Sequence, residues 1–231
     1  GFALVPLLFL ALDNLLRRPS LGRALTFGVV AALFVTSTIP GFTYIVAIAL
    51  LVYVLAFFVA RAFANQERLS LASEAARGGF LLLAVLIAVP LSGYYLAGLL
   101  VSTLPLVEET GGYDVEFISR NLLSYREAVA LASRWLEVSN PGAEVAAMAL
   151  AGVAVVASLL RFHYRVAALL VIAAISIVFA TNVTSPAYTF LMDHLPYFSL
   201  VRGPARWTGL ALLAYSLLLA IGLAAAIQGL R

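Results

Sequence analysis

The chain contains no cysteine and no lysine among its 231 residues, and it has only two histidines, His163 and His194. Without cysteine it has no disulfide, no thiolate metal ligand and no cysteine nucleophile. Charged residues make up 11% of the chain and apolar residues 64%, against roughly 45 to 50% apolar in a soluble domain. These proportions exclude an ordinary water-soluble core and indicate burial in lipid.

The few charges leave long uncharged gaps. No charged residue occurs from position 24 to position 60, a run broken by Pro40-Gly41, and further uncharged runs cover 78–107, 145–160, 166–192 and 207–230. A membrane-spanning helix needs about 17 to 25 apolar residues. The sequence therefore predicts an all-α polytopic transmembrane helix bundle, in a multi-pass integral protein of the plasma or cell membrane.

We expect about seven spans in a single transmembrane domain, residues 1–231. They cover residues 1–12, 24–39, 42–60, 80–103, 145–160, 166–181 and 208–230. The second and third form a hairpin that turns at Pro40-Gly41, and residues 61–79 connect it to the fourth span, which Pro90 and Gly93 can kink. The first span is short and opens without a methionine, so we expect the chain to be a fragment of a longer protein.

The arginines define a predicted topology. Nine of the fourteen fall in one set of alternate loops: Arg17, Arg18, Arg23, Arg61, Arg68, Arg77, Arg161, Arg165 and Arg231. The other loops hold five arginines, Arg120, Arg126, Arg134, Arg202 and Arg206, together with eight of the eleven acids. By the positive-inside rule the nine-arginine side is cytoplasmic. The basic balance is then a membrane signal, and we expect membrane lipid and no nucleic acid as a partner.

The first long outer segment, residues 104–144, is predicted to carry an amphipathic helix. Ser124 and Glu127 fit a capping box that starts a helix, apolar residues then follow at helical spacing up to Val138, and the run 139–142 (Ser-Asn-Pro-Gly) ends it. The simpler interpretation is a helix that covers the bundle, and the alternative is a substrate lid.

The second outer segment, residues 182–207, concentrates polar residues just before the last span. Pro204 is suited to the first position of a helix, with Arg206 in its first turn and Arg202 just upstream. Free backbone N–H groups and two guanidinium groups then meet near the outer membrane face, which suits a phosphate or diphosphate. The alternative is that Arg206 and Trp207 anchor the helix at the membrane interface.

Two weaker groups of polar residues lie on the same side. Asp193 and His194 are candidate substrate-binding residues, because an acid and an imidazole can share proton transfer, although a structural hydrogen bond at a helix end is the simpler interpretation. Four acids of the first outer segment could bind a divalent cation as a cofactor, although a solvated acidic loop is the simpler interpretation: Glu108, Glu109, Asp114 and Glu116.

A competing motif lies on the inner side. The run Glu74-Ala75-Ala76-Arg77-Gly78-Gly79, followed by Pro90, is similar to the EAA loop with which transporter permeases dock an ATPase. The match departs from that pattern, because the glycine and the proline both come early and Val89 stands in place of a leucine. A transporter permease subunit and a non-catalytic membrane scaffold are the alternatives that the sequence leaves open.

Three stretches resemble the carboxy-terminal membrane portion of GT-C superfamily glycosyltransferases, in particular the YfhO-like proteins. They are Val5 to Leu8 leading to Asp13 to Arg18, then Val89-Pro90 through Leu104-Pro105, and last Leu195 to Arg206, which fits the pattern L-P-x-F-x-x-x-R-x-P-x-R. The resemblance implies an enzyme that takes a sugar from a polyprenyl-phosphate carrier at the outer membrane face. The family's catalytic acid precedes this region, so no catalytic residue carries over, and only Arg202 and Arg206 match the family's late arginines.

Overall fold

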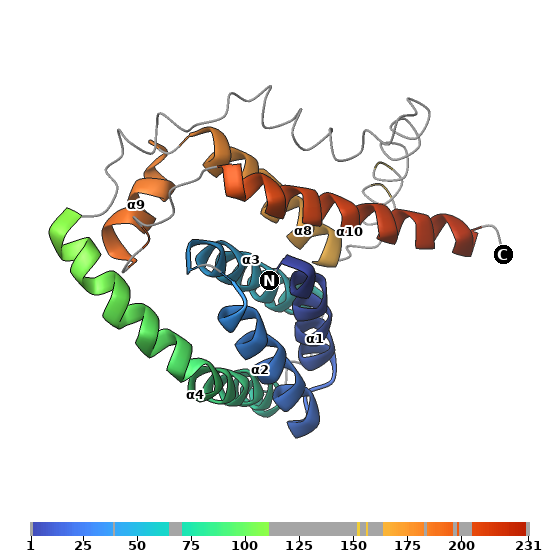
Figure 1. Cartoon of the computed structure of the whole chain (residues 1–231). Coiled ribbons are helices and arrows are strands. Elements are labelled where there is room, and N and C mark those ends of the chain that lie inside the picture. The colour runs from blue at the N-terminus through green and yellow to red at the C-terminus, as the bar shows by residue number, and fades with distance from the viewer. Residues whose placement is uncertain are drawn as a thin grey trace. The chain divides into compact units, whose positions relative to one another are not determined.

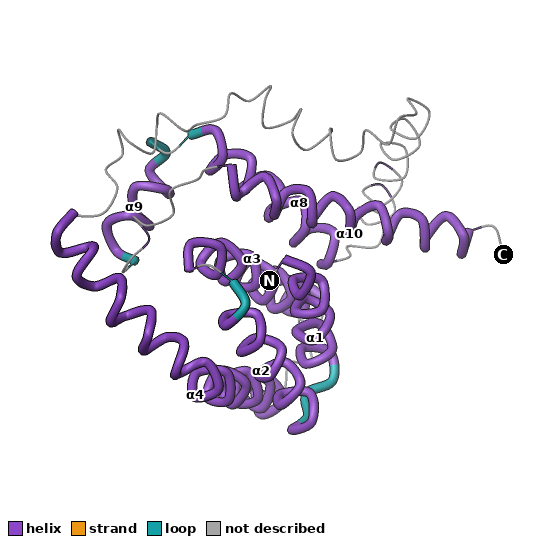
Figure 2. Tube along the Cα trace, viewed as in Figure 1, coloured by secondary structure: helices purple, strands orange, loops and turns teal. Residues whose placement is uncertain are grey.

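The computed structural model describes residues 2–38, 40–64, 71–110, 152, 156, 164–182, 184–195, 198 and 205–229. Every regular element in these ranges is a helix (Figure 2), as the all-α prediction requires. In chain order they are η1 Phe2–Leu4, α1 Val5–Arg17, α2 Leu21–Thr36, α3 Pro40–Ala64, α4 Leu71–Thr110, α8 Tyr164–Thr181, α9 Pro186–His194 and α10 Ala205–Gly229 (Figure 1).

Four of the described helices are long and apolar enough to cross a membrane. The spanning segments are Gly41–Phe63, Ala72–Gly98, Tyr164–Thr181 and Arg206–Ala224, and Leu21–Thr36 is a shorter apolar helix. These helices confirm the prediction of a multi-pass membrane protein. The predicted span 145–160, apart from residues 152 and 156, and the predicted amphipathic helix 125–138 lie outside the described residues.

Several helix ends differ from the predicted boundaries. The α1 helix continues through Asp13 to Arg17, because nothing breaks a helix before Pro19. The α2 helix starts at Leu21, earlier than predicted, because the Ser20 hydroxyl accepts a 3.4 Å hydrogen bond from the Arg23 backbone N–H and caps the helix. The α4 helix takes in residues 71–79 and 104–110, which were predicted as connecting segments.

Pro90 lies at the middle of the 40-residue α4 helix. A proline has no N–H to offer the carbonyl one turn before it, so a helix bends there at little further cost. The Ser92 hydroxyl donates a 2.7 Å hydrogen bond to the Ala88 carbonyl in the same turn. In Figure 1 the darker and lighter green halves of α4 run in different directions, in agreement with the predicted kink.

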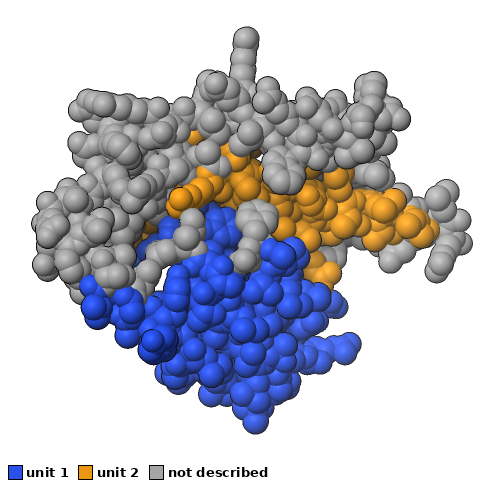
Figure 3. Space-filling model, viewed as in Figure 1, with its two compact units in different colours: residues 1–50, 61–112 blue, residues 51–60, 113–231 orange. Residues whose placement is uncertain are grey.

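The chain divides into two compact units, which are coloured separately in Figure 3. Unit 1 consists of Gly1–Leu50 and Arg61–Gly112, and unit 2 of Leu51–Ala60 and Tyr113–Arg231. The α3 helix therefore contributes residues to both units. The prediction of a single transmembrane domain stays a prediction.

In unit 1, α2 packs most extensively along α4 and next along α1. The close approach to α4 depends on Gly28, where an added Cβ would lie 2.8 Å from the Ala84 carbonyl oxygen and 2.9 Å from Ile87 Cγ2. The predicted turn between α2 and α3 is present, and Phe34 and Phe42 contact each other across it with ring centroids 6.1 Å apart. The turn that the sequence predicts is thus in place, and the most extensive packing of α2 is with α4.

The carboxyl end of α2 is closed by hydroxyl groups. Thr36, Ser37 and Thr38 donate to carbonyls of the last turns, and the shortest of these bonds joins Thr38 Oγ1 to the Phe34 carbonyl at 2.6 Å. The Tyr95 hydroxyl of α4 then donates a 2.7 Å hydrogen bond to the Thr38 carbonyl. Because lipid offers no hydrogen bonds, side-chain partners of this kind let a helix end within or near the bilayer.

In unit 2, α8 and α10 pack along each other, and Figure 1 shows them side by side. Phe179 near the end of α8 contacts Trp207 at the start of α10, so the two helices are antiparallel. Tyr53 and Phe57 of α3 pack edge-on against Tyr164, with ring centroids 5.9 and 5.2 Å away. Both contacts lie at the opposite end of α8 from Phe179.

Candidate functional site

The arginine segment leads into the first turn of α10. This helix starts at Ala205, directly after Pro204, and holds Arg206 in its first turn, as the sequence predicts. Arg206 is partly exposed. The first turn of a helix has backbone N–H groups without intrahelical partners and carries the positive end of the helix dipole. Arg202 lies outside the described residues, so its position relative to Arg206 stays a prediction.

Trp207 fixes this helix start. Its side chain is fully buried, and its ring packs edge-on against Phe179 with centroids 4.8 Å apart. Phe179 also contacts Tyr188 at 5.4 Å, and Tyr188 contacts Phe198 at 5.4 Å. We call these four rings the aromatic cluster. The alternative interpretation of Trp207 as an anchor at the lipid interface is wrong, because the residue is a core residue of unit 2.

The aromatic cluster joins three helices near one end of unit 2. Phe179 belongs to α8, Tyr188 to α9 and Trp207 to α10. Edge-on ring pairs are worth about 0.5 to 1.5 kcal/mol beyond the area they bury. Because Arg206 directly precedes Trp207, the cluster holds the backbone of the arginine as well. The guanidinium group therefore extends from a firmly held turn.

Three polar atoms in and below the cluster are buried without a hydrogen-bond partner in the part of the chain that the structure describes. They are the Tyr188 hydroxyl, Trp207 Nε1 and the Ser176 hydroxyl, on α9, α10 and α8. Burial raises the pKa of Tyr188 to about 12, because removal from water disfavours the phenolate. An unsatisfied buried polar group costs about 1 to 3 kcal/mol. These groups therefore offset part of the stability that the packing of the aromatic cluster contributes.

Asp193 and His194 occupy the last turn of α9 and are exposed. The His194 ring stacks on Phe190, with centroids 4.2 Å apart, and its Nδ1 lies 3.0 Å from the Phe190 carbonyl. This geometry is the helix-end hydrogen bond that was the simpler interpretation. The two residues form no ion pair or hydrogen bond with Arg206 in the described chain, so their part in substrate binding stays a prediction.

The predicted cation site is divided between described and undescribed residues. Glu108 and Glu109 lie at the end of α4, whereas Asp114 and Glu116 lie outside the described residues. Among the residues that the structure describes, no group of three or more acidic or histidine side chains is arranged to hold a metal ion.

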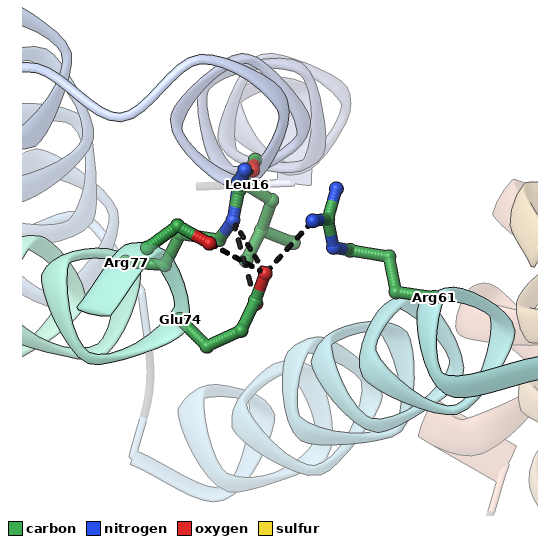
Figure 4. A network of polar contacts seen from close by, with 5 residues as sticks. Leu16, Arg61, Glu74 and Arg77 are labelled. Atoms are coloured by element: carbon green, nitrogen blue, oxygen red, sulfur yellow. Dashed lines mark hydrogen bonds and ion pairs between the residues drawn. The ribbon is translucent and has the colours of Figure 1, made fainter. Parts of the chain in front are cut away.

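A second polar cluster lies in unit 1 and centres on Glu74 (Figure 4). The Arg61 guanidinium of α3 lies 2.8 Å from the Glu74 carboxylate, and Arg77 Nε lies 3.4 Å from it. Arg77 also donates a 2.9 Å hydrogen bond to the Leu16 carbonyl in the last turn of α1. The three side chains are only 12 to 29% exposed. Glu74 therefore joins α1, α3 and α4, which gives the EAA-like run an internal structural role.

Sequence analysis missed both the aromatic cluster and the Glu74 cluster. The sequence does contain a pattern that indicates the Glu74 cluster, because Glu74 and Arg77 are one helical turn apart and Arg61 ends the preceding span. For the aromatic cluster the signal is weak, since Phe179, Tyr188 and Trp207 are separated by loops of unpredictable geometry.

No family model, no curated protein and no solved structure matches this chain. The class that the fold defines is a multi-pass α-helical membrane protein. Any narrower function depends on the chemistry of the polar residues at the helix ends.

Proposed function

We propose that the protein is a GT-C-like, YfhO-like membrane glycosyltransferase that handles a polyprenyl-phosphate-linked sugar at the outer membrane face, with Arg202 and Arg206 binding the lipid phosphate. The observation that carries this proposal is the position of Arg206 in the first turn of α10, directly before the buried Trp207. The resemblance of residues 195–206 to the late arginine segment of that family is the second support.

The chemistry of the helix start supports a phosphate ligand. A guanidinium group offers a planar set of N–H donors that matches two phosphate oxygens. The unpaired N–H groups of the first turn of α10 add donors, and the helix dipole favours negative charge at the same end. A phosphate bound there is held by a turn that the aromatic cluster keeps in place.

Arg206 is also available for a ligand. It forms no ion pair with any residue that the structure describes. In the predicted topology it lies on the outer side, where arginine is otherwise disfavoured. No residue of this chain is assigned to catalysis, and the sugar acceptor is likewise unassigned. Asp193 and His194 are proposed only as further contacts to the sugar.

The test compares two ligands on the same protein. Affinities for a polyprenyl phosphate and for the neutral polyprenol are measured in nanodiscs for the wild type, Arg202→Ala and Arg206→Ala. A charge-assisted hydrogen bond is worth about 1.5 to 3 kcal/mol, so each alanine variant should bind the phosphate about ten- to a hundredfold more weakly. Binding of the polyprenol should not change.

Lysine variants test the geometry of the contact. Arg206→Lys should restore part of the affinity, because lysine keeps the charge but loses the two-pronged contact. If both alanine variants bind the phosphate as tightly as the wild type, the arginines are membrane anchors and the proposal is wrong. If phosphate and polyprenol affinities fall together, the substitutions have disturbed the fold and not a phosphate contact.

A further inference from the structure

The arginine-rich end of unit 1 is a second place where the chain can meet an anion. Five arginines occupy the ends of α1, α2, α3 and α4 that meet there: Arg17, Arg18, Arg23, Arg61 and Arg77. Three of them form ion pairs or hydrogen bonds with other residues of the chain. Arg61 and Arg77 pair with Glu74, and Arg23 donates a hydrogen bond to the Arg18 carbonyl.

Arg17 and Arg18 remain available. Both side chains are exposed, and neither forms an ion pair with any residue that the structure describes. Of the two described acids at this end, Glu74 pairs with Arg61 and Arg77, and Asp13 is buried. Among the described residues at this end of unit 1, Arg17 and Arg18 therefore present positive charge at the surface without an ion-pair partner.

An exposed apolar stripe begins next to these two arginines. Only Pro19 and Ser20 separate Arg18 from α2, whose outward face carries large apolar side chains four residues apart. These are Leu21, Leu25, Val29 and Leu33, which are 42 to 57% exposed. At 1.5 Å per residue the stripe extends about 18 Å along the helix, a length that suits the acyl chain of a lipid. The positive charge of the arginines is thus followed by an apolar surface, just as the charged headgroup of a phospholipid is followed by its acyl chain.

We propose that Arg17 and Arg18 bind the phosphate of an anionic phospholipid in the leaflet beside this end of unit 1, with an acyl chain along the α2 stripe. This inference is independent of the proposed transferase function. A guanidinium pair attracts an anionic headgroup more strongly than a zwitterionic one, because zwitterionic headgroups carry no net charge. Each arginine near an anionic surface contributes an attraction that salt weakens.

The test measures lipid selectivity of the full chain in vesicles. Spin-labelled phosphatidylglycerol and spin-labelled phosphatidylcholine are compared by the fraction of each that the protein immobilises. The wild type should prefer phosphatidylglycerol. The double variant Arg17→Gln with Arg18→Gln should lower that preference about three- to tenfold, and the matched Arg17→Lys with Arg18→Lys variant should keep most of it. High salt should weaken the wild-type preference, whereas inorganic phosphate at matched ionic strength should not displace the lipid.

Four results would overturn the inference. One is an equal association of the two lipids with the wild type. Another is an unchanged preference in the glutamine variant. A third is an equal loss in the lysine and glutamine variants, because the effect would then follow from the shape of the arginine side chains or from misfolding and not from charge. Displacement by inorganic phosphate would instead assign the arginines to a soluble anion.

Discussion

The Arg77 guanidinium donates a 2.9 Å hydrogen bond to the carbonyl of Leu16, a residue 61 positions earlier in the chain. Carbonyls in the last turn of a helix have no intrahelical partner. In α1, one of these carbonyls accepts its hydrogen bond from a side chain of α4 instead of from water. The same arginine lies 3.4 Å from the Glu74 carboxylate, which in turn pairs with Arg61. One carboxylate thus keeps two guanidinium groups in place between three helices.

Replacing Glu74 should therefore destabilise unit 1. Glu74→Gln removes the carboxylate that pairs with both Arg61 and Arg77, and we expect the free energy of unfolding to fall by about 1 to 3 kcal/mol. The partial exposure of the three side chains keeps the loss below that of a fully buried pair. The measurement is equilibrium unfolding in mixed micelles followed by circular dichroism.

Asp193→Asn is the matched control for Glu74→Gln. It also replaces a carboxylate by an amide, but Asp193 is exposed, so its effect should stay within about 0.5 kcal/mol. Equal stability changes in the two variants would contradict a structural role for the Glu74 cluster.

The contact between α2 and α4 predicts that Gly28 tolerates no side chain. In an open helix position, glycine to alanine stabilises by up to about 1 kcal/mol. At Gly28 the new methyl group would meet the Ala84 backbone carbonyl at 2.8 Å, and a backbone atom cannot move aside cheaply. Gly28→Ala should instead destabilise by about 1 to 3 kcal/mol.

Gly79→Ala provides the control for Gly28→Ala, because a Cβ at Gly79 has nothing within 4 Å. It should be neutral or stabilising in the same unfolding measurement. A stabilising Gly28→Ala would show that α2 and α4 lie further apart than the 2.8 Å contact implies.

The sequence predicted the helices well and their pairing poorly. Long uncharged runs determine where spans lie, because a charge in lipid is costly, and α3, α8 and α10 lie where such runs occur. The predicted ends of α2 and α4 differ from the observed ones because of interactions of individual side chains. Ser20 caps α2 ahead of the uncharged run, and the polar residues Glu74 and Arg77 are compatible with α4 because they pair with each other and with neighbouring helices.

Pairing between helices depends on surface shape, which a single sequence does not display. The α2–α3 hairpin was inferred from a short turn, whereas the observed α2–α4 packing depends on the absence of a side chain at Gly28. For the candidate site, proline's preference for the first helical position predicts a helix start at Pro204, and the described α10 starts one residue later, at Ala205. The burial of Trp207 was not predicted, since tryptophan in membrane proteins is also common at the lipid interface.

Tyr188 makes the stability of unit 2 depend on alkaline pH. Burial raises its pKa to about 12 from 10.0. Below pH 10 the folded and unfolded states both keep the proton. As pH rises from 10 to 12 the unfolded state loses the proton first, so unfolding becomes more favourable, by roughly 2 to 3 kcal/mol at the upper end.

Tyr188→Phe should remove this pH dependence and should not lower stability at neutral pH, because the buried hydroxyl has no partner among the described residues. Unfolding of the two proteins is compared at pH 9 and at pH 11.5, and the difference between them isolates Tyr188 from the other nine tyrosines of the chain. A loss of stability in Tyr188→Phe at neutral pH would mean that the hydroxyl has a bound partner. Tyr188→Ala should cost about 3 to 5 kcal/mol by opening a cavity.

The last prediction concerns the orientation of the chain in the membrane. Because the chain has no cysteine, single cysteines can be placed without background labelling, at Asn14 in the last turn of α1 and at Thr184 between α8 and α9, both exposed. Asn14 lies beside the arginine-rich end of unit 1, which the positive-inside rule assigns to the cytoplasm. In intact cells an impermeant thiol reagent should modify Thr184→Cys and should reach Asn14→Cys only after permeabilisation. The reverse result would put the start of α10 and Arg206 on the cytoplasmic side, where they could not bind a sugar carrier at the outer face.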